Sequence, residues 1–167
     1  MALTPRKQLS LDTNLLFDLA EEKDFAHDFR EEFQRRGYRL LLPPTVRHEL
    51  HTIFTEGVSS ADRDLARSTL LNLRKWGIQP IDLDSTADAV ARIFAQDLLS
   101  RRLIPDEEFN DGLILAESAI IEIPLLVTSD KHLLDIDEDA LLLALNEANL
   151  PAVRPVHPKR MLRAVRW

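Results

Sequence analysis

Four acidic residues, far apart in the chain, could together do metal-dependent chemistry. They are Asp12, Glu49, Asp111 and Asp130. Mg²⁺ and Mn²⁺ prefer oxygen ligands, and carboxylates are the side chains that most often supply them. A pair of such ions can activate water, shield a phosphate and stabilise a leaving oxygen. If the fold brings these carboxylates together, the chemistry they favour is hydrolysis of a phosphodiester bond.

Each acidic residue also has an ordinary structural interpretation. Asp12 and Asp130 each come at the end of a short apolar segment, where an aspartate often caps the next helix. Glu49 alone would be an exposed helix residue, and Asp111 could favour a helix N-terminus through the helix dipole. Taken one at a time, the four residues indicate nothing more. Their order and their places relative to the predicted strands make the shared role the stronger hypothesis.

Short apolar segments alternate with longer helical patterns along the chain. This alternation predicts an α/β fold, a three-layer α/β/α sandwich with a central parallel sheet of four to five strands. In such sheets the functional residues gather beyond the carboxyl ends of the strands. Strands are predicted at 8–11, 38–42, 78–83, 125–128 and, at an edge, 153–156. Helices are predicted at 14–20, 24–36, 43–56, 59–76, 85–102, 110–121, 137–148 and 158–165, with a short one after Ser129.

Three polar residues near the strand ends could support the carboxylates. Asn14, Thr128 and Ser129 could orient the aspartates or bind a phosphate. For Asn14 and Ser129, helix capping is an equal alternative, because both residue types are favoured caps. The acidic run 106–108 indicates a solvated loop, although one of its side chains could be an additional outer ligand. The histidines of the segment His48–His51 are three residues apart, which does not fit the zinc protease motif.

Composition limits the class of protein. The chain has 167 residues, no cysteine and a formal net charge of −7. Its length predicts a single domain over residues 1–167. Without cysteine, a metal must be held by oxygen or histidine. No apolar run is long enough for a membrane span and the first residues do not resemble a signal peptide, so we expect a cytoplasmic protein without a membrane partner.

Two regions stand out from the predicted core. A helical insertion is expected at about 59–102, which could form a partner groove, a dimer interface or a substrate clamp. The segment 154–167 forms a basic tail with five Lys and Arg side chains and no acidic one. This tail could contact phosphates, but a solvated helix face or a contact with an acidic partner would also explain it.

Four segments, in this order, resemble the PIN-domain family. They are LDTNLL at 11–16, PPTVRHELHTI at 43–53, NDGLILAESA at 110–119 and LLVTSDKHLL at 125–134. The resemblance implies an α/β/α sandwich, Mg²⁺ or Mn²⁺ as cofactor and hydrolysis of RNA, with Asp12, Glu49, Asp111 and Asp130 as catalytic and metal-binding residues. Many small prokaryotic members are toxins of toxin–antitoxin pairs of the VapC kind. The resemblance therefore also implies an RNA substrate, an antitoxin protein and a homodimer.

Two other functions remain open at the level of sequence. One is a PIN-like nucleic-acid-binding module without catalysis, although all four acidic positions are filled. The other is an Asp-based phosphotransfer or receiver-type domain, which also places aspartates at strand ends. Asp12 is followed by Thr-Asn, which does not fit the Asp-x-Asp pattern of haloacid dehalogenase-like phosphatases.

Overall fold

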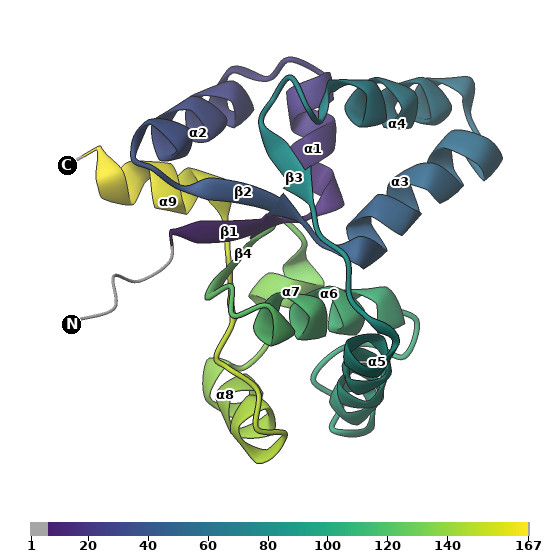
Figure 1. The fold of residues 1–167 in the computed structure, drawn as a ribbon, viewed down its shortest axis with the longest axis vertical. Coiled ribbons are helices and arrows are strands. Elements are labelled where there is room, and N and C mark those ends of the chain that lie inside the picture. Colours follow the sequence, from purple (N-terminus) through teal and green to yellow (C-terminus); the bar gives the residue numbers. More distant parts are fainter. Residues whose placement is uncertain (1–6, 167) are drawn as a thin grey trace.

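A five-stranded parallel sheet forms the centre of the computed structural model, which describes residues 7–166 (Figure 1). The strand order is β3-β2-β1-β4-β5, and every neighbouring pair is parallel. Predictions that extend to residues 1–6 and 167 lie outside the described residues. The strands are β1 (Gln8–Leu11), β2 (Arg39–Leu42), β3 (Ile78–Pro80), β4 (Leu125–Val127) and β5 (Arg154–Val156).

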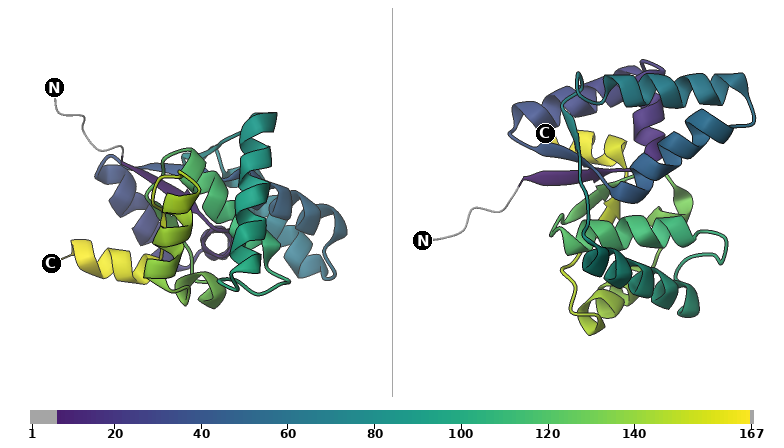
Figure 2. Two further views of the ribbon diagram at one scale, coloured as in Figure 1. Left: turned by 90° about the horizontal axis from the view of Figure 1, so that it is seen from below. Right: turned by 45° about the vertical axis from the view of Figure 1, so that its right-hand side comes forward.

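Helices connect the strands and cover both faces of the sheet. Figure 1 shows α1, α2 and α4 on one side of the sheet and α5, α6 and α8 on the other, and the right-hand view of Figure 2 shows the same layers again. The helices are α1 (Thr13–Ala20), α2 (Asp24–Arg35), α3 (Pro44–Glu56), α4 (Ser60–Asn72), α5 (Ser85–Ser100), α6 (Phe109–Ile120), α7 (Lys131–Leu134), α8 (Glu138–Glu147) and α9 (Pro158–Val165).

The three inner strands, β2, β1 and β4, are short and mostly buried because both faces of the sheet are covered. All four residues of β1 are buried, and Leu40, Leu41 and Leu42 of β2 are buried as well. Strands buried on both faces are expected to be continuous hydrophobic runs rather than alternating ones. A hydrophobic cluster continues from the sheet into both helical layers. This packing holds the helices next to the sheet in fixed positions, and so fixes the positions of the acidic residues that they carry.

The connections between strands change direction once, between β1 and β4. The chain runs from β1 outward to β2 and β3, then returns to the other side of β1 to form β4 and β5. At such a switch point the connecting segments leave neighbouring strands on opposite faces of the sheet, and a crevice opens beyond their carboxyl ends. The end of β1 and the end of β4 therefore face a common space.

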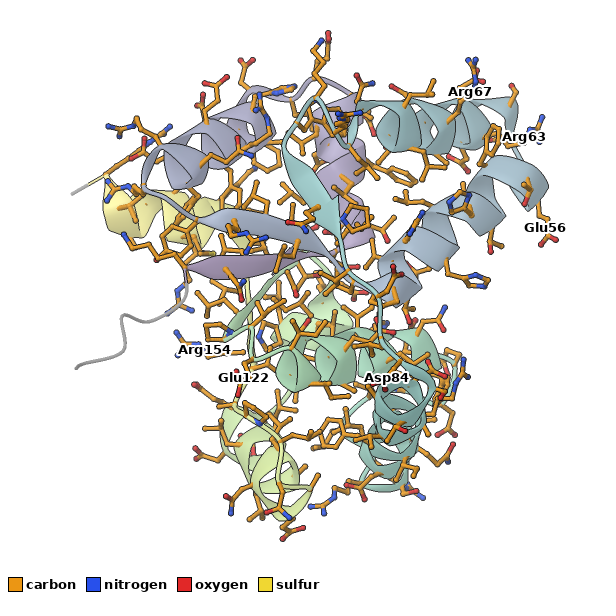
Figure 3. The ribbon with its side chains drawn as sticks, viewed as in Figure 1. Glu56, Arg63, Arg67, Asp84, Glu122 and Arg154 are labelled. Carbon is orange, nitrogen blue, oxygen red and sulfur yellow. The ribbon has the colours of Figure 1, made fainter. Side chains whose placement is uncertain are left out.

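The predicted fold class is confirmed, and most predicted elements appear within a few residues of their expected bounds. The strand predicted at 78–83 is shorter, because β3 ends at Pro80, which lacks a backbone donor. The helix predicted over 85–102 begins at Ser85 and is capped by Asp84 (labelled in Figure 3), whose carboxylate accepts a hydrogen bond from the Ala87 backbone at 2.8 Å. The receiver-type alternative requires the strand order 2-1-3-4-5, which this sheet does not have.

The region expected as a helical insertion at about 59–102 contains α4 and α5 with β3 between them. Helix α4 packs on α3 and α1, and α5 packs along α6. The close approach of α5 and α6 is made at Gly112, where an added Cβ would lie 3.0 Å from the Cβ of Ala95. Among the described residues, no helix combines the length and the apolar character that crossing a membrane would require.

Candidate functional site

Asp12 and Asp130 lie at the switch point of the sheet, as their positions in the sequence predicted. Asp12 directly follows β1, and its backbone N–H continues the ladder to β4 by donating to the Val127 carbonyl at 3.0 Å. Asp130 follows β4 and begins α7, where its Oδ1 accepts from the His132 backbone at 2.9 Å. Asp12 likewise caps α1, accepting from the Thr13 backbone at 2.8 Å. Both aspartates therefore cap helices and also face the crevice.

The hydroxyl group of Thr128 joins these two aspartates. Thr128 is fully buried, and its Oγ1 donates to Oδ2 of Asp12 at 2.7 Å. The same oxygen accepts from the Asp130 backbone N–H at 3.0 Å and from Nδ2 of Asn14 at 3.4 Å. One hydroxyl group thus fixes the orientation of Asp12 and the path of the chain into Asp130.

Asn14 and Ser129 are not helix caps. Asp12 occupies the capping position of α1, and Asp130 occupies that of α7. The Asn14 side chain instead spans from α1 to the loop after β4, accepting a hydrogen bond from the Ser129 backbone at 3.2 Å. The capping alternative is wrong for both residues, because the neighbouring aspartates already satisfy the helix ends.

Glu49 is held between two helices other than its own. Its Oε2 accepts from the Thr13 hydroxyl of α1 at 2.7 Å, and its Oε1 accepts from Nδ2 of Asn110 in α6 at 3.4 Å. Helix α3 approaches both α1 and α6, so the glutamate points toward the same crevice as Asp12. Neither Thr13 nor Asn110 was expected as a partner, because a side-chain contact across 36 or 61 residues leaves no local pattern.

Asp111, Asp130 and Glu108 form a tight cluster of carboxylates. One oxygen from each lies within 4.8 Å of the others. Glu108 comes from the acidic loop before α6, which we expected mainly as a solvated loop with one possible outer ligand. The loop instead turns this glutamate toward the crevice, while Asp106 and Glu107 are exposed. Oδ2 of Asp111 is buried and has no hydrogen-bond partner among the described residues.

The carboxylates of the crevice are difficult to ionise together. Burial is the largest cause that raises the pKa of Asp111 to about 8, and the negative charges of Asp130, Asp12, Glu108 and Glu49 raise it further. Burial also raises the pKa of Asp12 to about 6, against the lowering effect of its hydrogen bond from Thr128. The pKa of Glu49 is raised as well, mainly by burial. Such a site favours protons or cations over a full set of free negative charges.

A further buried carboxylate, Glu117, lies deeper along α6. It accepts hydrogen bonds from the Thr45 backbone at 3.0 Å and from the Thr45 hydroxyl at 2.6 Å. Burial raises its pKa to about 7. These bonds tie the first turn of α3 to α6, one turn before Glu49. Glu117 was not among the residues expected from the sequence, and an acidic residue within the largely apolar segment Leu113–Ala119 is the signal that could have identified it.

The basic segment at 154–166 has several contacts within the molecule. Arg154 pairs with Glu138 at 3.1 Å, and Arg166 pairs with Asp28 at 3.2 Å. The ammonium of Lys159 lies 4.7 Å from the centre of the Phe25 ring. Arg160 and Arg163 are exposed on α9, and no carboxylate of the described residues lies within ion-pair distance of either. The segment is therefore divided between charges that are paired within the molecule and charges that face solvent.

Comparison with known proteins supports the fold and goes no further. No family model matches the chain, and no curated protein matches it. Among solved structures, the protein resembles a chain in the crystal structure of VapBC2 from Rickettsia felis bound to a DNA fragment from their promoter. The two chains share a fold. The TM-score is 0.60 at 16% identity, and the match covers 90% of this chain and 98% of that chain. The similarity therefore extends over nearly the whole of both chains.

Proposed function

We propose that this protein is a metal-dependent endoribonuclease of the PIN type. The observation that carries the proposal is the group of carboxylates at the switch point of the sheet, where Glu108, Asp111 and Asp130 have oxygens within 4.8 Å of one another. Asp12 and Glu49 face the same crevice and affect the pKa of Asp111. The resemblance of four sequence segments to PIN domains and the fold shared with a VapBC2 chain support the same function.

The donor set fits Mg²⁺ or Mn²⁺. All the candidate ligands are carboxylate oxygens, which hard divalent cations prefer. The buried Oδ2 of Asp111 lacks a hydrogen-bond partner among the described residues, and a bound cation would satisfy this oxygen by coordinating it. We assign Asp12, Asp111 and Asp130 as ligands, with Glu49 and the additional Glu108 completing the group directly or through water. When bound, the metal supplies charge stabilisation for the phosphate and lowers the pKa of a bound water.

The side chains around the ligands have separate tasks. Thr128 holds the Asp12 carboxylate by its 2.7 Å hydrogen bond, and Asn14 braces the loop that carries Ser129. Oε1 of Glu49 has only a long bond from Asn110 at 3.4 Å, so it can still accept a hydrogen bond from the attacking water. The raised pKa of Glu49, caused mainly by burial, makes its carboxylate a stronger base for taking up that proton.

We further propose that the protein is the toxin of a toxin–antitoxin pair in the cytoplasm. The similar chain comes from a VapBC2 structure that contains DNA, and the match covers 98% of that chain. An antitoxin protein is accordingly one proposed partner. A second copy of this chain is proposed as well, from the family resemblance of the sequence. RNA is the proposed substrate, with a domain spanning residues 1–167.

Replacing Asp12 by asparagine tests the nuclease proposal. Asparagine caps helices as well as aspartate does, so α1 should remain intact. We expect Mg²⁺- or Mn²⁺-dependent cleavage of a generic single-stranded RNA to fall by more than the roughly 10–100-fold that loss of an outer-shell partner costs. Asp139→Asn, an exposed residue of α8, is the matched control and should retain full activity.

Cleavage by Asp12→Asn at the rate of the unaltered protein would contradict the assignment. Absence of cleavage in every variant with either cation, on RNA and on single-stranded DNA, would favour the alternative of a nucleic-acid-binding module without catalysis. Cleavage of DNA alone would support the metal site but would show that the substrate is DNA rather than RNA.

A further inference from the structure

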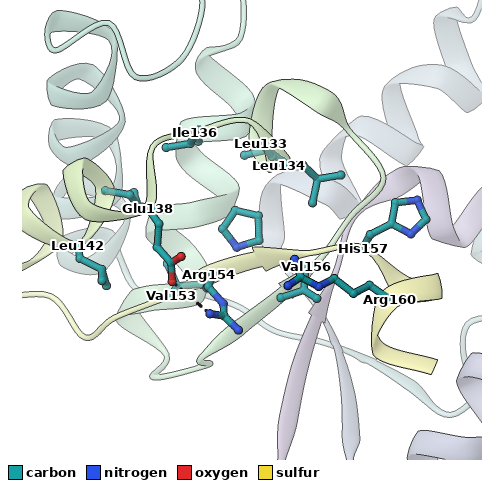
Figure 4. Close-up of a pocket in the computed structure, with 12 residues that line it drawn as sticks. Leu133, Leu134, Ile136, Glu138, Leu142, Val153, Arg154, Val156, His157 and Arg160 are labelled. Carbon is teal, nitrogen blue, oxygen red and sulfur yellow. Dashed lines mark hydrogen bonds and ion pairs between the residues drawn. The ribbon is translucent and has the colours of Figure 1, made fainter. Parts of the chain in front are cut away.

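A pocket of about 360 Å³ lies beyond β5, outside the carboxylate group. It is enclosed by α7, by the first turns of α8, by β5 and by the start of α9. Figure 4 shows His157 and Arg160 toward one end of this pocket and Glu138 and Leu142 toward the other. Its volume is at the lower end of the range for small-molecule sites, which are usually about 300–1,000 Å³. The pocket is therefore large enough for one flat ring system and its immediate substituents.

The pocket combines an apolar wall with a positive rim. Leu133, Leu141 and Val153 line it and are buried. Arg154 and Arg160 also line it, and within the described part of the chain Glu138 is its acidic lining residue. Arg154 is paired with Glu138 at 3.1 Å, so the guanidinium of Arg160 is left to attract an anion.

His157 adds a fixed hydrogen-bond donor to this rim. Its Nδ1 accepts from the Lys159 backbone at 3.1 Å, which places the proton of the neutral ring on Nε2. Burial and the nearby positive charges of Lys159 and Arg163 lower the pKa of His157, so the neutral ring is favoured. An Arg side chain, an imidazole N–H and an apolar wall together match a ligand with a flat apolar body and an anionic group.

The position of the pocket relates it to the carboxylates. Helix α7 begins at its cap Asp130 and ends with Leu133 and Leu134, which line the pocket. A helix of this length spans only about 6 Å. Strand β5 also pairs directly with β4, which leads to Asp130. A polymer that presents a phosphate to the carboxylates can therefore reach the pocket with a neighbouring unit.

We propose that this pocket binds an unpaired base of single-stranded RNA, with the phosphate of that nucleotide on Arg160 and His157. The proposal rests on the proposed nuclease function and adds to it the form of the substrate and a subsite. Single-stranded RNA offers unstacked bases that pack against apolar, imidazole and guanidinium surfaces, whereas a duplex keeps its bases stacked. The chain's net charge of −7 disfavours general capture of nucleic acid, so a local positive rim has to position the strand.

The test measures binding rather than cleavage, so that it does not depend on the metal site. The Asp12→Asn protein is kept in EDTA and titrated with nucleoside 5′-monophosphates by NMR, and with a short fluorescein-labelled single-stranded RNA by anisotropy. We expect shifts of the Leu133, Leu134 and Val156 signals. Adding Arg160→Ala should raise the Kd for the RNA about tenfold, because a hydrogen bond to a charged group is lost.

Two further variants separate the pocket from general electrostatics. Leu142→Glu places a negative charge at a partly exposed pocket residue and should raise the Kd by a similar factor without disturbing the core. Lys159→Ala removes one positive charge from the same helix, on the side that faces Phe25, and should change the Kd less than twofold.

Equal Kd values for Arg160→Ala, Leu142→Glu and the parent protein would overturn the inference even if the unaltered enzyme cleaves RNA. Equal losses in Lys159→Ala and Arg160→Ala would do the same, because only net charge would then matter. Binding of an acidic peptide at these residues in preference to the nucleotide would also overturn it. Nucleotide binding at the pocket in a protein that cleaves no RNA would support the pocket and contradict the nuclease proposal.

Discussion

Thr128 carries no charge, yet its hydroxyl group connects more of the site than any single carboxylate does. It donates to Asp12 and accepts from the backbone of Asp130 and from Asn14. A carboxylate that must present an oxygen to a cation loses less free energy on binding if its orientation is already fixed. The threonine therefore supports the proposed metal site although it offers no ligand of its own.

Thr128→Val tests this role at nearly constant volume. Valine leaves Oδ2 of Asp12 without its donor and the Asp130 backbone N–H without its acceptor. We expect metal-dependent cleavage to fall by about 10–100-fold, with weaker metal affinity measured by titration calorimetry. Thr52→Val, an exposed change in α3, is the control. Unchanged metal affinity in Thr128→Val would show that Asp12 does not need the hydrogen bond from Thr128 to bind the metal.

Helix α6 connects the sheet to the site. Its residues Asp111–Ala119 are buried, and Ser118 donates to the Ser10 hydroxyl of β1 at 2.8 Å. Near its start it carries Asp111, and farther along it carries Glu117, which binds the first turn of α3. The contact between Glu117 and Thr45 therefore helps to set the distance between Asp111 on α6 and Glu49 on α3, although neither of these two residues takes part in it.

Glu117→Ala should loosen this connection between α6 and α3. It leaves the buried hydroxyl and N–H of Thr45 without an acceptor, and leaving such buried groups unpaired costs about 1–3 kcal/mol. We expect the free energy of unfolding, measured by urea titration, to fall by about that amount. Glu107→Ala, in the exposed loop before α6, should leave it unchanged. Equal stability of the two variants would mean that α3 holds its position without Glu117.

On the scale of the whole molecule, three buried carboxyl groups resist ionisation in a chain whose net charge is already negative. The pKa values of Asp12, Glu117 and Asp111 are raised to about 6, about 7 and about 8, in each case mainly by burial. Each group binds its proton more tightly in the folded than in the unfolded chain. The stability from these protons is complete below the ordinary pKa values and is lost as the pH rises through the raised ones.

Without metal, the protein should therefore melt at a higher temperature near about pH 5 than near about pH 8. We expect a difference of at least about 3 °C by calorimetry in EDTA, since about 1 kcal/mol shifts the melting temperature of a chain of this size by a few degrees. Asp111→Asn should reduce the difference. Mg²⁺ or Mn²⁺ should stabilise the protein more at the higher pH, because cations compete with protons for the same oxygens. A melting temperature that rises with pH in EDTA would contradict this account.

Local patterns in the sequence determined the layers of the fold and the positions of two of the candidate site residues. Apolar runs with turn and cap residues at their ends specify strands and helices, because the groups that decide them are near neighbours in the chain. Asp12 and Asp130 could be placed at one edge of the sheet, since the carboxyl ends of parallel strands meet there. Asp111 follows closely, because it opens the helix before the fourth strand, whereas Glu49 depends most on the family resemblance, since its helix alone would not have marked it.

Tertiary structure decided which other side chains meet these four carboxylates. Thr13 and Asn110 on Glu49, Glu108 beside Asp111, and Glu117 on Thr45 are contacts between elements far apart in sequence. Such contacts depend on how helices cross and how a loop turns, which burial of the whole core sets. The carboxylates at the switch point could thus be anticipated from the chain, whereas the hydroxyl and amide groups that orient them, and the pocket beyond β5, follow from the packing.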